Sequence, residues 1–372
     1  MRQTMNMEAV EVDSIFQQSF ELSLQGNYEA AITALNRVIE SQPNVWDVWV
    51  EKGRMLHSLG QYEDAIACFE QAIVLQPNAA IPHYSLGWTT YALGNYEAAT
   101  QSFQAVLKLE PDFPDLHYSL GLTLYASGQY EAAIGYFRRA LENRTDCADA
   151  WYCQGFCLYA THRYEGAVQH FNHVLELQPD YQEAYVGRGD ALKELGDFEA
   201  AIASYDKALE FYGNDSNVIF HRALCLKQLG RQEEALQNFQ QVTDSHPTHW
   251  EAWYGQAGVH LKLGDFEAAI AAYEQVVELN PNSYEAWFNR GVAFKNLNQW
   301  SEAVASYDKA LELRPNDHRA WNNRGGVLVS MGCLEDAIAC FDKVLELNPN
   351  DTKAQQNRTI LQKRLDATKP VQ

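Results

Sequence analysis

Residues 284–317 read YEAWFNRGVAFKNLNQWSEAVASYDKALELRPND, and the segments on both sides repeat this pattern in the same phase. The period is marked by prolines that stand 34 or 68 residues apart: Pro43, Pro77, Pro111, Pro179, Pro247, Pro281, Pro315 and Pro349. Thr145 and Gly213 occupy the two skipped phases, so ten positions share one register without an inserted residue. A fixed period of this length is typical of a repeat array, in which each repeat packs against its neighbours.

Counting back from these positions divides residues 12–351 into ten repeats, numbered here 1 to 10: 12–45, 46–79, 80–113, 114–147, 148–181, 182–215, 216–249, 250–283, 284–317 and 318–351. Each repeat holds two stretches with the apolar periodicity of a helix, separated by a turn. Glycine stands in eight of these turns, where its left-handed conformation ends the first helix, and His162 and Asn298 replace it in repeats 5 and 9. The pattern therefore predicts an all-α chain of helix hairpins.

The two ends of the array depart from the pattern, as terminal repeats that face solvent do. Residues 1–11 are a lead-in, and repeat 1 lacks the usual tryptophan and glycine of the first helix. Residues 352–366 predict a capping helix with Ala354, Leu361 and Leu365 on its apolar side, and residues 367–372 predict a frayed tail.

Small and large residues recur at fixed positions within the repeat. Position 20 is alanine in all ten repeats, position 8 is mostly glycine, and position 24 is phenylalanine or tyrosine from Phe69 to Phe341. We expect the position 8 glycine to face the position 20 alanine, because small side chains let two helices approach closely. Position 4 is often tryptophan, which we expect to fill space around that contact.

These positions together give the pattern W…LG…Y…G-x-Y…A…F…A…P, which resembles the tetratricopeptide repeat family over residues 12–351. The resemblance implies a right-handed α-solenoid, a superhelix of antiparallel helix pairs whose first helices line a concave groove. It also implies that positions 2, 5, 9, 12 and 13 face this groove. The near-consensus repeats, rich in Gln and Asn, look like bacterial arrays.

Two sets of candidate binding residues follow from these groove positions. Repeats 3 to 5 carry an aromatic ladder with aspartates at position 2: Tyr84, Trp88, Tyr91, Asp115, Tyr118, Leu122, Tyr125, Asp149, Tyr152, Phe156 and Tyr159. Repeats 6 to 9 carry aromatic rings at position 5 and lysines at position 12: Lys193, Phe220, Lys227, Tyr254, Phe288 and Lys295. Tyrosine suits a recognition surface because it joins apolar area to a polar tip. The lysine row indicates either a site for acidic groups or solvated lysines beside neighbouring acids.

Arginine recurs at position 7 together with an acid at position 25. Within one repeat the pairs are Lys52 with Glu70, Arg188 with Asp206, Arg290 with Asp308, and Arg324 with Asp342. Arg222 faces Gln240 and Gln256 faces Glu274, so two repeats are partial exceptions. We interpret the pattern as an ion pair that joins the two helices of one hairpin.

Charge and composition exclude several function classes. The net charge of −21 disfavours nucleic acid and anionic membranes as partners, and no apolar stretch predicts membrane insertion. Seven cysteines without a C-x-x-C pair and a start without a signal-peptide core favour the cytoplasm. His170 and His173 lie one helical turn apart without a third metal ligand nearby, and a redox role for Cys147, Cys153 and Cys157 stays open. No motif for catalysis or for a cofactor occurs.

We therefore expect a non-enzymatic scaffold that binds an extended peptide or a helix of a partner protein in its groove. Chaperone-tail binding through the carboxylate clamp of the family is excluded, because that mode needs lysine at position 5 and no repeat has it. Two alternatives stay open. One is an assembly protein that acts by self-association, and the other is a regulatory subunit of an enzyme complex.

Overall fold

The computed structural model describes residues 14–368, and this part of the chain is helical throughout, with no strand. The predictions for the lead-in at residues 1–11 and for the tail beyond residue 368 lie outside it. Residues 14–24 are helical and precede α2. The helices that follow are α2 (Tyr28–Ser41), α3 (Trp46–Ser58), α4 (Tyr62–Leu75), α5 (Ala80–Ala92), α6 (Tyr96–Leu109), α7 (Leu116–Ala126), α8 (Tyr130–Asn143), α9 (Ala148–Ala160), α10 (Tyr164–Leu177), α11 (Gln182–Leu195), α12 (Phe198–Tyr212), α13 (Ser216–Gln228), α14 (Gln232–Ser245), α15 (Trp250–Leu263), α16 (Phe266–Leu279), α17 (Tyr284–Asn296), α18 (Trp300–Leu313), α19 (His318–Met331), α20 (Leu334–Leu347) and α21 (Thr352–Thr368).

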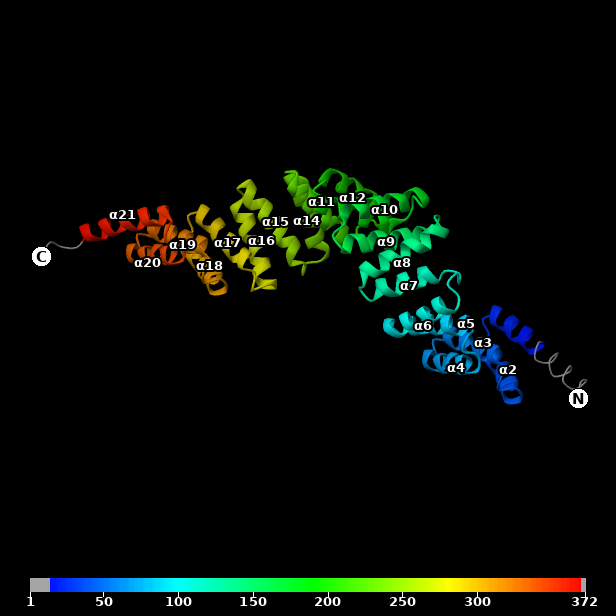
Figure 1. The fold of residues 1–372 in the computed structure, drawn as a ribbon. Coiled ribbons are helices and arrows are strands. Elements are labelled where there is room, and N and C mark those ends of the chain that lie inside the picture. The colour runs from blue at the N-terminus through cyan, green and yellow to red at the C-terminus, as the bar shows by residue number, and fades with distance from the viewer. Residues whose placement is uncertain (1–13, 369–372) are drawn as a thin grey trace, which may run out of the picture. The chain divides into compact units, whose positions relative to one another are not determined.

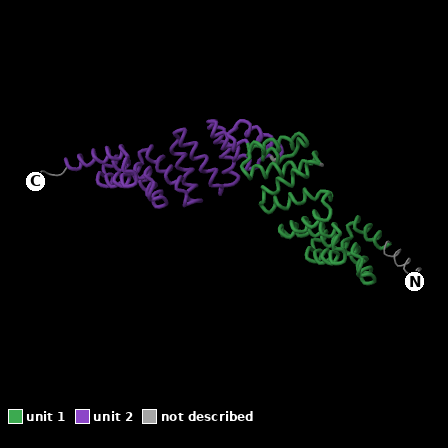
Figure 2. Tube along the Cα trace, viewed as in Figure 1, with its two compact units in different colours: residues 1–191 green, residues 192–372 purple. Residues whose placement is uncertain are grey.

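The chain divides into an N-terminal unit, residues 1–191, and a C-terminal unit, residues 192–372 (Figure 2). In the N-terminal unit α3 packs on α4, α5 on α6, α7 on α8 and α9 on α10, and each hairpin also contacts the next (Figure 1). The C-terminal unit repeats this arrangement from α13 with α14 to α19 with α20, and α21 packs on α20. The predicted all-α solenoid of helix hairpins is confirmed. Within residues 14–368, none of the helices combines the length and the apolar character needed to span a membrane.

The turns between paired helices adopt the left-handed conformation that the sequence predicts. Gly60 has a φ of 75°, and His162 and Asn298, which replace glycine, both have a φ of 59°. Asp115 is the remaining non-glycine residue with positive φ in residues 14–368, at 57°. It lies after Pro114 and shortens the first helix of repeat 4, because α7 begins only at Leu116.

Position 8 glycines lie against the aromatic ring at position 24, and their expected contact with the position 20 alanine stays a prediction. A Cβ at Gly53 would lie 2.6 Å from a ring carbon of Phe69, and one at Gly121 would lie 2.8 Å from the ring of Phe137. The rings of Phe69 and Phe137 are 1% and 0% exposed. Glycine is needed here because the helix backbone lies against the face of a buried ring.

Position 4 side chains form hydrogen bonds with the loop between successive repeats. The indole Nε1 of Trp49, Trp287 and Trp321 donates a hydrogen bond to the carbonyl of the proline six residues earlier, at 2.8–2.9 Å. Tyr185 donates to the Pro179 carbonyl in the same way. These rings therefore satisfy a loop carbonyl that no helix hydrogen bond reaches. Trp49 and Trp321 also pack against the buried clusters of their hairpins, as expected.

The ion pairs at position 7 join neighbouring repeats, so the predicted pairing within one hairpin is wrong. The guanidinium of Arg290 binds Glu274 at 2.8 Å, and that of Arg324 binds Asp308 at 2.6 Å. In both cases the acid lies in the second helix of the preceding repeat, 16 residues earlier. Arg290 also donates to the Ser306 hydroxyl of its own hairpin at 3.1 Å. One guanidinium thus contacts three successive helices.

This register also explains the two exceptions in the sequence pattern. Arg222 pairs with Asp206 at 2.6 Å, and Gln256 donates to the side-chain oxygen of Gln240 at 2.8 Å. In this last pair both the position 7 residue and its position 25 partner are uncharged, which is expected if the two side chains contact each other directly.

Helix α21 continues the register of a first helix. Ala354 and Leu361 are 0% and 2% exposed, and Leu365 packs at the edge of the same cluster. Arg358 forms an ion pair with Asp342, the acid at position 25 of repeat 10. The last hairpin therefore receives from α21 the kind of ion pair that Arg290 and Arg324 make with the hairpins before them.

Candidate functional site

First helices of successive repeats contact each other, and their exposed sides form the candidate groove. Helix α3 contacts α5, and α7 contacts α9. The imidazole of His57 lies 3.0 Å from the Thr89 hydroxyl across the first of these contacts. A pocket of about 200 Å³ lies here, lined by Arg54, His57, Phe69, Tyr84, Ser85, Trp88 and Thr89. Residues at positions 5, 9 and 12 thus come together, as the groove assignment requires.

The tyrosines at position 5 support the core as well as the groove. Tyr84 lies with its ring centroid 5.5 Å from that of Phe103, Tyr118 6.1 Å from Phe137, and Tyr152 5.8 Å from Phe171. In the C-terminal unit Phe220, Tyr254 and Phe288 pack on the position 24 ring of their own repeats at 5.8–6.0 Å. Position 5 therefore has a structural role in repeats 3 to 5 and 7 to 9.

Positions 9 and 12 form a more superficial aromatic layer. Trp88 lies 5.4 Å from Tyr91, and Phe156 lies 5.4 Å from Tyr125 of the preceding repeat, both edge to face. Phe156 and Tyr159 are 6.4 Å apart, which extends the layer along α9. All five side chains are half-buried. Burial raises the pKa of Tyr125 to about 12, so its hydroxyl stays protonated and can donate a hydrogen bond.

The aspartates at position 2 have partners within the chain. Asp115 forms an ion pair with Arg144, and Asp149 accepts a hydrogen bond from the Tyr181 hydroxyl at 3.0 Å. Leu122 packs with Tyr118 and Tyr125 at the edge of the cluster around Phe137. The two aspartates therefore connect the starts of their first helices to residues elsewhere in the chain.

A pocket at the start of α7 was not predicted from the sequence. It measures about 290 Å³ and is lined by residues that include Phe113, His117, Tyr118, Arg139 and Arg144. It lies where α7 begins late. The proline at the first position of repeat 4, Pro114, is the sequence feature that marks the irregular repeat.

The three lysines of the predicted row differ in their surroundings. Lys193 lies 3.5 Å from Glu194, and Lys295 donates to the Asn323 side-chain oxygen at 3.2 Å. Lys227 lines a pocket of about 350 Å³ together with Phe220, Leu224, Trp250, Glu251, Tyr254, Gly255, Ser283 and Glu285. Desolvation by burial, with the nearby charge of Lys262, lowers the pKa of Lys227.

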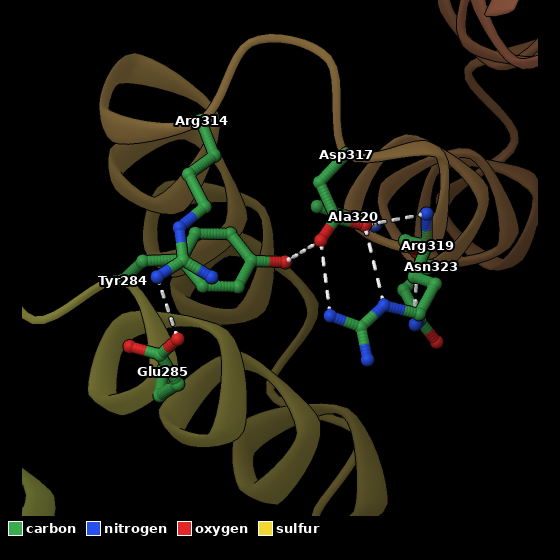
Figure 3. Close-up of polar contacts among 7 residues, drawn as sticks. All are labelled: Tyr284, Glu285, Arg314, Asp317, Arg319, Ala320 and Asn323. Atoms are coloured by element: carbon green, nitrogen blue, oxygen red, sulfur yellow. Dashed lines mark hydrogen bonds and ion pairs between the residues drawn. The ribbon is translucent and has the colours of Figure 1, made fainter.

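A polar network occupies repeats 9 and 10 beside Lys295 (Figure 3). The Tyr284 hydroxyl donates to Asp317 at 2.6 Å, and Arg319 binds the same carboxylate at 3.0 Å. Burial alone would raise the pKa of Asp317, but the hydrogen bonds from Arg319 and Tyr284 hold it well below its usual range. The Arg314 guanidinium stacks on the Tyr284 ring at 4.3 Å. The network therefore stabilises the start of α19, because Arg319 within the same chain neutralises the charge of Asp317.

The cysteines and histidines set aside in the sequence lie in packing environments. Burial raises the pKa of the Cys153 and Cys157 thiols to about 12, which leaves very little reactive thiolate at neutral pH. His170 and His173 both pack on the Trp151 ring, at 5.1 and 4.4 Å. Within the described part of the chain, no three His, Cys, Asp or Glu residues are grouped so that they could hold a metal ion.

Comparison with known protein families matches nearly the whole array. Models described as tetratricopeptide repeat or TPR repeat match residues 12–45, 53–94, 84–146, 119–181, 158–219, 222–283, 259–296, 284–317 and 318–351. A comparison with curated protein sequences found no match.

Several solved structures are similar to this chain. YrrB, described as a TPR protein with an unusual peptide-binding site, is 26% identical; the match covers 48% of this chain and 91% of YrrB, with a TM-score of 0.45. A tetratricopeptide repeat protein from Parabacteroides merdae is 20% identical over 67% of this chain and 98% of that one, with a TM-score of 0.49. MamA from Desulfovibrio magneticus is 24% identical over 46% of this chain and 98% of its own, with a TM-score of 0.44.

Proposed function

Because the chain belongs to the tetratricopeptide repeat family, whose members are typically non-catalytic interaction scaffolds, we propose that it binds an extended or helical segment of a partner protein along the groove of its first helices. The bound segment lies across positions 9 and 12 of repeats 3 to 5. Its apolar side chains contact Trp88, Tyr91, Tyr125, Phe156 and Tyr159. The cytoplasm is the proposed compartment.

The aromatic layer at positions 9 and 12 is the observation that carries this proposal. The glycine at 8, the alanine at 20 and the ring at 24 are buried within the hairpins, whereas the rings at positions 9 and 12 are half-buried, and Trp88 also packs on the Phe103 ring at 5.6 Å. Five half-buried rings in three successive repeats, three of them tyrosines with a hydroxyl tip, suit the recognition of apolar side chains and of backbone carbonyls. The pocket of about 200 Å³ beside Trp88 has room for one such side chain.

The double variant Tyr125→Ala/Phe156→Ala tests this proposal. These two rings contact each other and the peripheral rings of Tyr130 and Tyr159, so the substitutions spare the buried position 24 rings. In affinity capture from the native lysate, we expect the variant to lose the partners that wild type retains. Removal of two anchoring aromatic residues weakens binding by roughly 30-fold or more.

The matched control is Leu177→Ala/Phe211→Ala, which removes two apolar side chains that are 37% and 43% exposed and lie outside the groove positions. Far-UV circular dichroism verifies that both double variants stay helical. Equal capture by wild type and the groove variant would show that the aromatic layer is not the binding site. Concentration-dependent mass without any captured partner would favour self-association instead.

A further inference from the structure

Lys227 differs from the exposed lysines of the C-terminal unit because it is half-buried and its ammonium lacks a partner. Among the described residues it makes neither an ion pair nor a side-chain hydrogen bond, and its nearest charged influence is Lys262. The exposed Lys309, by contrast, binds Glu312 at 2.7 Å. In a chain of net charge −21, a partly buried ammonium without an ion pair needs a separate explanation, since burial of an unpaired charge is costly.

The side chains around Lys227 form an apolar surface, and there is open space beside its ammonium group. Phe220 and Leu224 lie on its own helix, α13, and Tyr254 lies opposite on α15, all in the wall of one pocket of about 350 Å³. Position 9 of α15 is Gly258, and a Cβ there would lie 3.2 Å from the Lys227 Nζ. Glycine at this position therefore leaves space directly beside the charge.

The two glutamates of the pocket wall contact side chains other than Lys227. Glu285 binds Arg314 at 2.7 Å, and Glu251 lies 3.3 Å from the His249 imidazole. Neither neutralises Lys227. The pocket thus offers a cationic end, formed by Lys227 with Lys262 nearby, next to aromatic walls.

We propose that the pocket between repeats 7 and 8 binds an acidic residue of the partner segment, with its carboxylate at Lys227 and Lys262 and a neighbouring apolar side chain against Phe220 and Tyr254. A charge-assisted hydrogen bond to a carboxylate would supply the partner that the ammonium lacks. This inference rests on the proposed function, because it names what part of the bound segment enters this section of the groove.

The test uses two blocked tripeptides, acetyl-Phe-Glu-Leu-amide and acetyl-Phe-Gln-Leu-amide, with the full chain labelled with ¹³C at the lysine ε-carbons. The Lys227 signal is assigned by its absence in Lys227→Met. We expect the glutamate peptide to shift this signal saturably, and the glutamine peptide to bind at least tenfold more weakly. Lys227→Met is expected to lose at least tenfold in affinity for the glutamate peptide, and Lys309→Met is expected to bind like wild type.

Gly258→Leu provides a second variant that keeps the lysine. Its side chain fills the space beside the ammonium, so we expect weaker binding of the glutamate peptide with unchanged helicity. Equal binding of both peptides, unchanged binding by Lys227→Met, or no saturable shift would overturn the inference. The inference would also be overturned if the Lys227 signal shifted only on addition of a phosphoserine peptide, or only when the protein concentration changed. Any of these results, together with partner loss in Tyr125→Ala/Phe156→Ala, would leave the proposed function intact.

Discussion

The variant Phe137→Ala is expected to lower the free energy of unfolding by about 3–5 kcal/mol, the cost of removing a buried aromatic ring and leaving a cavity. Phe137 is 0% exposed and lies against the backbone of α7 at Gly121. It also anchors a cluster that contains Leu124, Ala133 and Cys153. Because Ala133 and Cys153 belong to different repeats, the loss affects both the hairpin and its interface with the next one.

Urea unfolding followed by far-UV circular dichroism measures this loss. The control Phe211→Ala removes an aromatic ring that is 43% exposed, and it should cost less than about 1 kcal/mol. A loss below about 1 kcal/mol for Phe137→Ala would mean that position 24 does not hold the hairpin together.

The variant Gly121→Ala is expected to be destabilising by about 1–3 kcal/mol, because its methyl group overpacks the core. The sign is the opposite of the usual effect, since alanine normally stabilises a helix interior by about 1 kcal/mol relative to glycine. The reason is the 2.8 Å distance between a Cβ at Gly121 and ring carbons of Phe137. In the Phe137→Ala background this obstacle is gone, so the same substitution should become stabilising.

The four proteins of this double-mutant cycle give the coupling between the two positions directly. Gly135→Ala is the matched control, because Gly135 lies within α8 and has nothing within 4 Å of its Cβ position. It should gain up to about 1 kcal/mol. Additive effects of Gly121→Ala and Phe137→Ala would contradict the close contact.

The 34-residue period was sufficient to predict the helices and their turns, but it was not sufficient to assign contacts between them. A side chain at position 7 can contact position 25 of its own repeat or of the preceding repeat. In a regular array both pairings give nearly the same sequence pattern. Arg222 and Gln256 distinguish the two, because each matches the preceding repeat and not its own.

The sequence predicted at which repeat positions the groove residues stand, but not how deeply each side chain is buried. That burial depends on side-chain packing, which the 34-residue period does not encode. Position 5 rings pack on the core ring of their own repeat, and the rings at positions 9 and 12 form a more superficial layer. Asp115 and Asp149 pair within the chain because Arg144 and Tyr181 happen to lie near them. The different surroundings of Lys193, Lys227 and Lys295 depend on single neighbours such as Asn323 and Gly258.

Site-specific photo-crosslinking tests most directly whether a partner segment lies along the first helices. Benzoylphenylalanine replaces Tyr91, at position 12 of repeat 3, or the exposed Phe211 outside the groove positions. After irradiation in the native lysate, the account predicts a crosslinked partner from position 91 and none from position 211. A partner crosslinked from position 211 and not from position 91 would contradict the groove as the binding surface.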